Sequence, residues 1–141
     1  MRIYVAGPLF SESERAWLDG LAAGLRTEGF DCFVPHEHFG EAPVPTAEAI
    51  FRIDADALRA CDVLVAWLDG PMVDDGTACE IGMFAQLERP IVGILTDLRL
   101  ERRRERGVAG GGMNLFVAGA IESCGSIVYD VDAAVAALRA L

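Results

Sequence analysis

One segment of the sequence is apolar over nearly the full length of a strand: residues 62–68, which read Asp-Val-Leu-Val-Ala-Trp-Leu. A strand with one solvated face alternates apolar and polar side chains, whereas this run has no polar residue after its first position. Both faces of such a strand are covered by other parts of the protein. The run therefore predicts a central strand in a parallel sheet.

The rest of the chain alternates between strand and helix patterns. The expected strands are residues 2–6, 31–34, 62–68, 91–95 and 126–129, and the expected helices are residues 13–27, 46–60, 76–87, 113–123 and 131–141. Residues 35–45, with three prolines, are expected to form a loop. Strands and helices that alternate at this spacing form parallel sheets through right-handed crossovers. We therefore predict one α/β domain over residues 1–141, a flavodoxin-like three-layer sandwich whose five-stranded parallel sheet has the order 2-1-3-4-5.

Charge and composition restrict the partners of the chain. The formal net charge is −10, which excludes nucleic acid and an anionic membrane surface, because both attract basic proteins. No apolar run approaches the roughly 20 residues that cross a bilayer, and the N-terminus has no signal-peptide pattern, so we expect a cytoplasmic protein. The four cysteines are widely spaced without a C-x-x-C pair, which predicts reduced thiols and no metal site.

A distinctive motif follows the apolar strand at residues 74–82, which read Asp-Asp-Gly-Thr-Ala-Cys-Glu-Ile-Gly. Open α/β sheets bind ligands at the carboxyl ends of their strands, where this motif lies. Glu80 begins an otherwise apolar helix face, which directs its side chain toward the protein. A purely structural interpretation is also possible, because Thr77 and Glu80 match the S/T-x-x-E capping box.

Further carboxylates come from the same strand and loop: Asp62, Asp69, Asp74 and Asp75. Clustered carboxylates repel one another, and this displaces their pKa values. One site can then hold both an ionised nucleophile and a protonated acid. The cluster favours a chemical role for Glu80 over a capping role.

A turn at residues 7–10, Gly-Pro-Leu-Phe, follows the first predicted strand. In the predicted strand order this turn faces residues 69–80 across one cleft. Gly7 permits close approach of the backbone, and Phe10 can stack on a planar ring, although a plain turn with a core aromatic is equally compatible. The turn is not a phosphate loop, because it lacks both G-x-G-x-x-G and the P-loop lysine.

Together these segments resemble the nucleoside 2-deoxyribosyltransferase family. The matching segments are residues 4–10 (Tyr-Val-Ala-Gly-Pro-Leu-Phe), 60–62 (Ala-Cys-Asp), 68–70 (Leu-Asp-Gly), 74–82, 96–99 (Thr-Asp-Leu-Arg) and 114–115 (Asn-Leu). They follow the order of the family over nearly the whole chain. The Gly-Thr-Ala-x-Glu-x-Gly core with its preceding aspartate is the most specific part.

The resemblance implies a role for each matching residue. Glu80 is the expected nucleophile at C1′ of a 2′-deoxyribonucleoside, and Tyr4 is expected to hold its carboxylate. Asp62 and Asp74 are expected to face the nucleobase, one of them as proton donor, with Asp75 as an alternative to Asp74. The other expected substrate contacts are Gly7, Pro8, Phe10, Asp69, Gly70, Gly76, Thr77 and, from a neighbouring subunit, Asn114, which binds the 5′-hydroxyl group. The resemblance also implies a homo-oligomer, from dimer to hexamer, that needs no metal or cofactor.

Three functions are compatible with these residues. The leading hypothesis is exchange of nucleobases on 2′-deoxyribonucleosides through a covalent Glu80 intermediate, by the logic of a retaining glycosidase. The second is hydrolysis of 2′-deoxynucleoside 5′-monophosphates, which needs a phosphate pocket near the first turn. Ser11, Ser13 and Arg15 partly favour that pocket, whereas Glu12 and Glu14 oppose it. The third is a non-catalytic nucleotide-sensing module.

Overall fold

The structure, a computed structural model of the chain, describes residues 1–38, 45–108 and 112–141. Its strands are β1 (Arg2–Ala6), β2 (Asp31–Phe33), β3 (Val63–Trp67), β4 (Ile91–Ile94) and β5 (Gly125–Val128). They pair in parallel in the order β2-β1-β3-β4-β5, which confirms the predicted sheet. The ladder places Ile3 beside Val63 and Leu64 beside Ile91.

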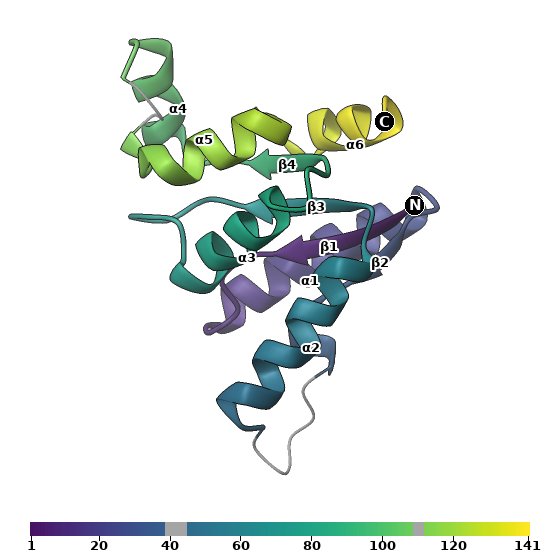
Figure 1. The fold of residues 1–141 in the computed structure, drawn as a ribbon. Coiled ribbons are helices and arrows are strands. Elements are labelled where there is room, and N and C mark those ends of the chain that lie inside the picture. Colours follow the sequence, from purple (N-terminus) through teal and green to yellow (C-terminus); the bar gives the residue numbers. More distant parts are fainter. Residues whose placement is uncertain (39–44, 109–111) are drawn as a thin grey trace.

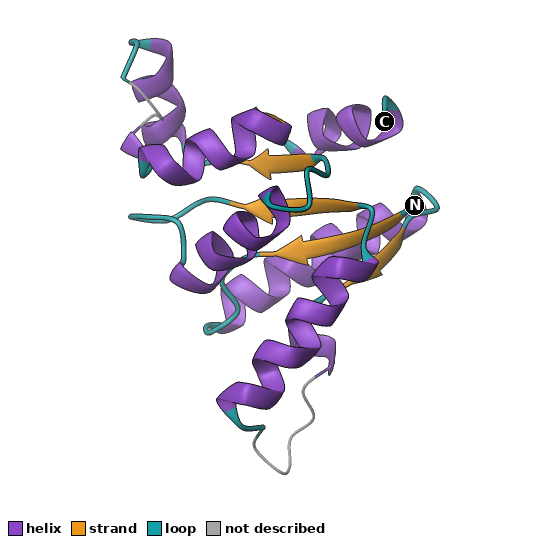
Figure 2. Cartoon of the chain, in the orientation of Figure 1, coloured by secondary structure: helices purple, strands orange, loops and turns teal. Residues whose placement is uncertain are grey.

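Helices cover both faces of this sheet (Figures 1 and 2). They are α1 (Glu12–Thr27), the 3-10 helix η1 (Pro35–His38), α2 (Ala47–Ala60), α3 (Asp75–Ala85), α4 (Leu98–Glu105), α5 (Leu115–Cys124) and α6 (Val131–Arg139). Side chains of α1 and α6 pack on one face, and side chains of α2, α3 and α5 pack on the other. The predicted three-layer α/β arrangement is therefore confirmed.

Alternate side chains of the central strand enter the two cores. On β3, Val63 and Val65 pack toward α1 and α6, whereas Leu64 and Ala66 pack toward α2, α3 and α5. All four are fully buried. This double burial is the physical reason why the strand is apolar at consecutive positions.

Two segments differ from the sequence-based expectations. The predicted loop over residues 35–45 begins with the helix η1, and residues 39–44 lie outside the described residues. The helix α4 is not among the five expected helices, because its sequence, Leu-Arg-Leu-Glu-Arg-Arg-Arg-Glu, has no apolar periodicity. A helix as short as η1 also leaves no periodic pattern to detect.

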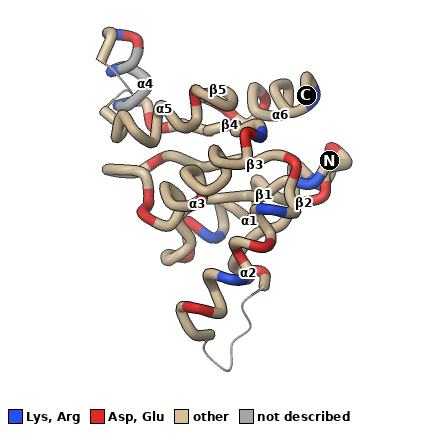
Figure 3. Tube along the Cα trace, viewed as in Figure 1, with Lys and Arg blue, Asp and Glu red and all other residues tan. Residues whose placement is uncertain are grey.

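Acidic residues are more frequent than basic ones, 22 against 12, and they are spread over many elements of the trace (Figure 3). Some lie at the turn between β3 and α3, at the carboxyl end of the central strand. In the part of the chain that the structure describes, no helix combines the length and apolar character needed to cross a membrane.

The packing of α3 gives a test of the fold. Phe84 lies on the buried face of this helix and is fully inaccessible to solvent. Phe84→Ala should lower the free energy of unfolding by about 3–5 kcal/mol, because it removes a large buried side chain and leaves a cavity. Urea denaturation followed by circular dichroism measures this change. Gln86→Ala, an exposed position beside the same helix, should change it by no more than about 0.5 kcal/mol. Equal effects of the two substitutions would contradict the assigned packing.

Candidate active site

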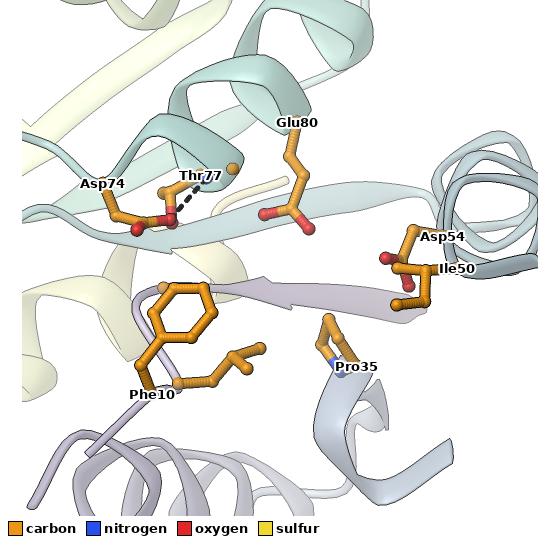
Figure 4. Close-up of a pocket in the computed structure, with 10 residues that line it drawn as sticks. Phe10, Pro35, Ile50, Asp54, Asp74, Thr77 and Glu80 are labelled. Atoms are coloured by element: carbon orange, nitrogen blue, oxygen red, sulfur yellow. Dashed lines mark hydrogen bonds between the residues drawn. The ribbon is translucent and has the colours of Figure 1, made fainter. Parts of the chain in front are cut away.

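A pocket of about 300 Å³ opens at the carboxyl ends of β1 and β3, the edge where α/β sheets bind ligands (Figure 4). Its described lining residues are Gly7, Leu9, Phe10, Pro35, Ile50, Asp54, Asp74, Gly76, Thr77 and Glu80. They come from the first turn, from η1 and α2, and from the start of α3. The strand order therefore brings the first turn and the motif at residues 74–82 together, as expected.

Glu80 lies at the centre of this site and is held by a tyrosine. The hydroxyl group of Tyr4, a fully buried residue of β1, donates a hydrogen bond of 2.6 Å to Oε1 of Glu80. The ring of Tyr4 stacks on Phe33 with centroids 5.3 Å apart, and Phe33 stacks on His38 at 4.2 Å. These contacts fix the tyrosine, and the tyrosine fixes one oxygen of the carboxylate.

The capping-box interpretation of Glu80 is wrong. The N-cap of α3 is Asp74, whose Oδ2 accepts hydrogen bonds from the Thr77 backbone N–H at 3.0 Å and from Thr77 Oγ1 at 3.1 Å. The helix thus begins before Thr77, and Glu80 lies too far along it to reach the N-cap. Its carboxylate is available to Tyr4 and to the pocket.

The two neighbouring aspartates of the motif have different surroundings. Asp74 lines the pocket, whereas Asp75 is exposed and accepts the N–H of Gly76 at 2.8 Å. Asp75 is not among the described residues that line the pocket. Of the two, Asp74 is placed to meet a ligand.

The expectation that Asp62 faces the ligand is wrong. Asp62 precedes β3 at its amino end, and its Oδ2 accepts the N–H of Arg2 at 2.7 Å. In a parallel sheet the amino ends lie at the opposite edge from the pocket. Asp54 of α2 lines the pocket instead. Sequence reasoning missed Asp54, although it lies between Ile50 and Leu58 on one helix face, the same pattern that singled out Glu80.

Other expected contacts have structural roles or lie outside this pocket. The carboxylate of Asp69 accepts hydrogen bonds from the backbone N–H groups of Thr96 and Asp97 and from the Thr96 hydroxyl group. It therefore ties the end of β3 to the end of β4. Gly70 has a φ of +128°, which favours glycine at this turn.

Gly7 lines the pocket, and Pro8 follows it without being among the described lining residues. A Cβ at Gly7 would lie 2.8 Å from Cδ2 of Leu18 and 3.3 Å from Cβ of Trp67, so any side chain at this position would force Leu18 to shift. Asn114 is the N-cap of α5, where its Oδ1 accepts the Phe116 N–H at 2.9 Å. Its contact with a neighbouring subunit remains a prediction.

Burial displaces the pKa values of the pocket carboxyl groups. The pKa of Glu80 rises to about 8, chiefly because the group is buried. The hydrogen bond from Tyr4 acts in the opposite direction, and the negative charges of Asp54 and Asp74 add to the rise. Burial also raises the pKa of Asp54 to about 6, against the effect of His38. The pKa of Tyr4 lies far above its ordinary value through burial and the charge of Glu80, so its hydroxyl group remains a donor.

The described side chains provide no cage for a metal ion. Among residues 1–38, 45–108 and 112–141, no group of three or more histidine, cysteine, aspartate and glutamate side chains is arranged to hold one. The functional groups in the described part of the site are carboxylates, a phenol and an exposed aromatic ring.

A family model for nucleoside 2-deoxyribosyltransferases matches residues 3–131. The chain belongs to the nucleoside 2-deoxyribosyltransferase family. This confirms the resemblance that the motifs carry. No curated protein matches the chain.

Solved structures share the fold of this family member over nearly its full length. A conserved protein from Enterococcus faecalis V583 is 27% identical, with a TM-score of 0.85 and coverage of 99% of this chain and 98% of the other. A 2-deoxyribosyltransferase from Bacillus psychrosaccharolyticus is 22% identical, with a TM-score of 0.74 and coverage of 95% and 90%. A CMP N-glycosidase from Clostridium botulinum is 18% identical, with a TM-score of 0.60 and coverage of 100% of both chains. The last two likenesses show the fold alone.

The raised pKa of Glu80 predicts a pH-dependent stability. A group whose pKa is about 8 in the folded protein and 4.5 in its ordinary state stabilises the fold below pH 4.5 and loses that contribution as the pH rises to 8. The side chain of Glu80→Gln cannot ionise. The free energy of unfolding of this variant minus that of the wild type should therefore grow as the pH rises from 5 to 9. Urea denaturation at a series of pH values measures this difference.

Glu48→Gln is the matched control for that series, because Glu48 is an exposed glutamate of α2 that pairs with Arg52. Its curve should run parallel to that of the wild type between pH 5 and 9. A constant difference between Glu80→Gln and the wild type over this range would contradict the assigned pKa.

Proposed function

We propose that the chain transfers 2-deoxyribose between nucleobases of 2′-deoxyribonucleosides by double displacement, through a covalent deoxyribosyl-Glu80 intermediate. The observation that carries the proposal is the Glu80 carboxylate, held by Tyr4 within a pocket that Asp54 and Asp74 also line. A nucleophile and an acid on one small pocket are what a retaining glycosyl transfer needs. Family membership supports the same class of reaction, a deoxyribosyltransferase or a related N-glycosidase.

In the first step Glu80 attacks C1′ while the bond from C1′ to the base nitrogen breaks. The bonding electrons pass to the base, and a proton from Asp54 neutralises it. We assign this proton to Asp54, which lines the pocket with Glu80 and has a pKa raised to about 6. Because the pKa of Glu80 is about 8, the single proton of the pair rests mainly on Glu80, and the reactive form is the minor one in which Asp54 carries it. Asp74, whose Oδ2 caps α3, orients the base instead.

In the second step a nitrogen of the acceptor base attacks C1′, and the bond to Glu80 breaks. The acceptor proton returns to Asp54, so the site is restored without any external acid. Two inversions at C1′ give net retention. Tyr4 supports both steps, because its hydroxyl group stabilises the carboxylate that leaves in the second.

The remaining residues shape the pocket around the substrate. Phe10 is 74% exposed at the rim, where its ring can stack on a nucleobase. Gly7, Gly76 and Thr77 line the same pocket. Asn114 from a neighbouring subunit binds the 5′-hydroxyl group, so the active form is a homo-oligomer. The proposal also includes a cytoplasmic location and a reaction that uses no metal or cofactor.

Replacement of the nucleophile tests the proposal directly. Glu80→Ala should reduce base exchange between a deoxyribonucleoside and a free base by at least about 10⁴-fold, because no covalent intermediate can form. Chromatography of the product nucleoside measures the exchange, and Glu48→Gln is the surface control. In the wild type, mass spectrometry should detect protein that carries one deoxyribosyl group after incubation with donor alone. Near-normal exchange by folded Glu80→Ala would overturn the proposal, and release of free sugar independent of acceptor would make the protein a hydrolase.

The proton assignment predicts a bell-shaped pH profile. The productive state has one proton on the Glu80–Asp54 pair, so kcat/KM should fall below pH 6, where both groups are protonated, and above pH 8, where both are ionised. Asp54→Asn should lower kcat by about 10²–10⁴-fold and remove the alkaline limb. Steady-state rates from pH 5 to 9 measure both effects. An alkaline limb that survives in Asp54→Asn but disappears in Asp74→Asn would assign the proton to Asp74.

A further inference from the structure

A column of three stacked rings leads from an exposed histidine to the tyrosine that holds Glu80. The ring of His38 stacks on Phe33 with centroids 4.2 Å apart and an interplanar angle of 6°. Phe33 stacks on Tyr4 with centroids 5.3 Å apart and an angle of 27°. The Tyr4 hydroxyl group in turn donates to Oε1 of Glu80 at 2.6 Å. A continuous series of contacts therefore connects the end of η1 to the carboxylate of the site.

The place of Phe33 in the sheet explains why the outer ring matters. Phe33 belongs to β2, an edge strand that pairs only with β1 among the described strands, and its partner in that ladder is Tyr4. The sheet thus supplies one neighbour of the Phe33 ring, and η1 supplies the other ring contact, His38. Stacked aromatic pairs gain stability beyond the area that they bury. The ring of His38 therefore restrains Phe33, and Phe33 restrains Tyr4.

Two polar contacts hold η1, and with it His38, against α1. Arg26 donates to both carboxylate oxygens of Glu37, from Nη1 to Oε1 at 2.9 Å and from Nη2 to Oε2 at 2.7 Å. Nε2 of His36 lies 2.7 Å from Oδ1 of Asp19. The outer ring of the column is thus carried by a helix whose own position is fixed.

His38 also acts on the second carboxyl group of the site, through its charge. Asp54 lines the pocket with Pro35 of η1 (Figure 4), and Oδ1 of Asp54 is buried without a hydrogen-bond partner among the described residues. The charge of His38 lowers the pKa of Asp54 against the larger effect of burial. The charges that act on Glu80 are those of Asp54 and Asp74. The ring and the charge of the histidine therefore influence different members of the pair, and substitutions can separate them.

We propose that His38 is a positioning residue for the nucleophile Glu80, and that it acts through its ring. Stacked on Phe33, this ring keeps Tyr4 in the orientation in which its hydroxyl group donates to the carboxylate. The inference rests on the proposed function for the catalytic role of Glu80. Loss of the ring should weaken the hydrogen bond, and because that bond lowers the pKa of Glu80, the pKa should rise. It should also lower kcat, since the carboxylate that leaves in the second step loses stabilisation.

Three variants separate the ring from the charge. His38→Phe keeps an aromatic ring on Phe33 and removes the charge, whereas His38→Leu removes both. His36→Gln, on the same short helix, removes an imidazole outside the column and keeps a side-chain N–H that can donate to Asp19. Circular dichroism establishes that each variant is folded.

The pKa of Glu80, followed by ¹³C NMR of its side-chain carboxyl group, tests the inference without any turnover. The proton affinity of Glu80 should rise about 2–10-fold in His38→Leu, the range expected for the loss of one aromatic pair. It should stay within about twofold of the wild type in His38→Phe and in His36→Gln. An unchanged pKa of Glu80 in His38→Leu, or an equal rise in His38→Phe or His36→Gln, would overturn the inference.

Steady-state rates of base exchange test the consequence for the reaction. In His38→Leu, kcat should fall about 2–10-fold with KM nearly unchanged, and the alkaline limb of the pH profile should move to higher pH. His38→Phe should restore kcat and the alkaline limb. Its acid limb should move to higher pH, because the charge that lowers the pKa of Asp54 is absent.

A double-substitution cycle shows whether His38 acts through Tyr4. In a Tyr4→Phe background no hydroxyl group remains to be positioned, so His38→Leu should change kcat by less than about twofold. An equal loss of kcat in both backgrounds would overturn the inference. Absence of base exchange in the wild type would instead refute the proposed function, and the NMR titration would still decide whether His38 holds the hydrogen bond.

Discussion

The hydrogen bond between the Tyr4 hydroxyl group and Oε1 of Glu80 joins the centre of the sheet to the helix that carries the site. Tyr4 belongs to β1 and is fully buried, so its position is fixed by the strands on either side and by the aromatic ring of Phe33. A carboxylate removed from water needs a partner of this kind, because an unpaired buried polar group costs several kcal/mol (about 2–7). The orientation of the Glu80 carboxylate in the pocket depends on this contact, and the hydrogen bond lowers the pKa of Glu80 against the effect of burial.

The same burial that makes the contact necessary also gives the site its acid and base properties. Desolvation raises the pKa of Glu80 to about 8 and that of Asp54 to about 6. Near neutral pH the pair therefore carries one proton, which rests mainly on Glu80, and the proposed reaction uses the arrangement in which Asp54 carries it and Glu80 is ionised. The apolar cores that stabilise the fold thus also set the chemistry at its edge.

The carboxylates near the pocket divide into two kinds. Asp69, Asp74 and Glu14 accept backbone N–H groups and hold, respectively, the ends of β3 and β4, the start of α3 and the first turn. Glu80 and Asp54 line the pocket with raised pKa values, and Asp74 lines it as well while it caps α3. The acidic composition of the chain therefore reflects both a structural and a chemical need, and only partners in space distinguish the two.

The sequence by itself determined the architecture, because the strand at residues 63–67 is apolar at every position and the alternation of strands with helices permits few topologies. It also determined that Glu80 turns inward, since a helix face has a regular period. The wrong expectation for Asp62 came from the family resemblance, since chain order already puts residue 62 at the amino end of its strand. Asp54 was missed because its helix α2 is far from the motif along the chain. The cap at Asp74 and the short helix η1 were likewise decided by the tertiary structure. The physical reason is that periodicity is a local property, whereas hydrogen-bond partners and burial at the carboxyl edge of the sheet depend on segments that meet only in the folded chain.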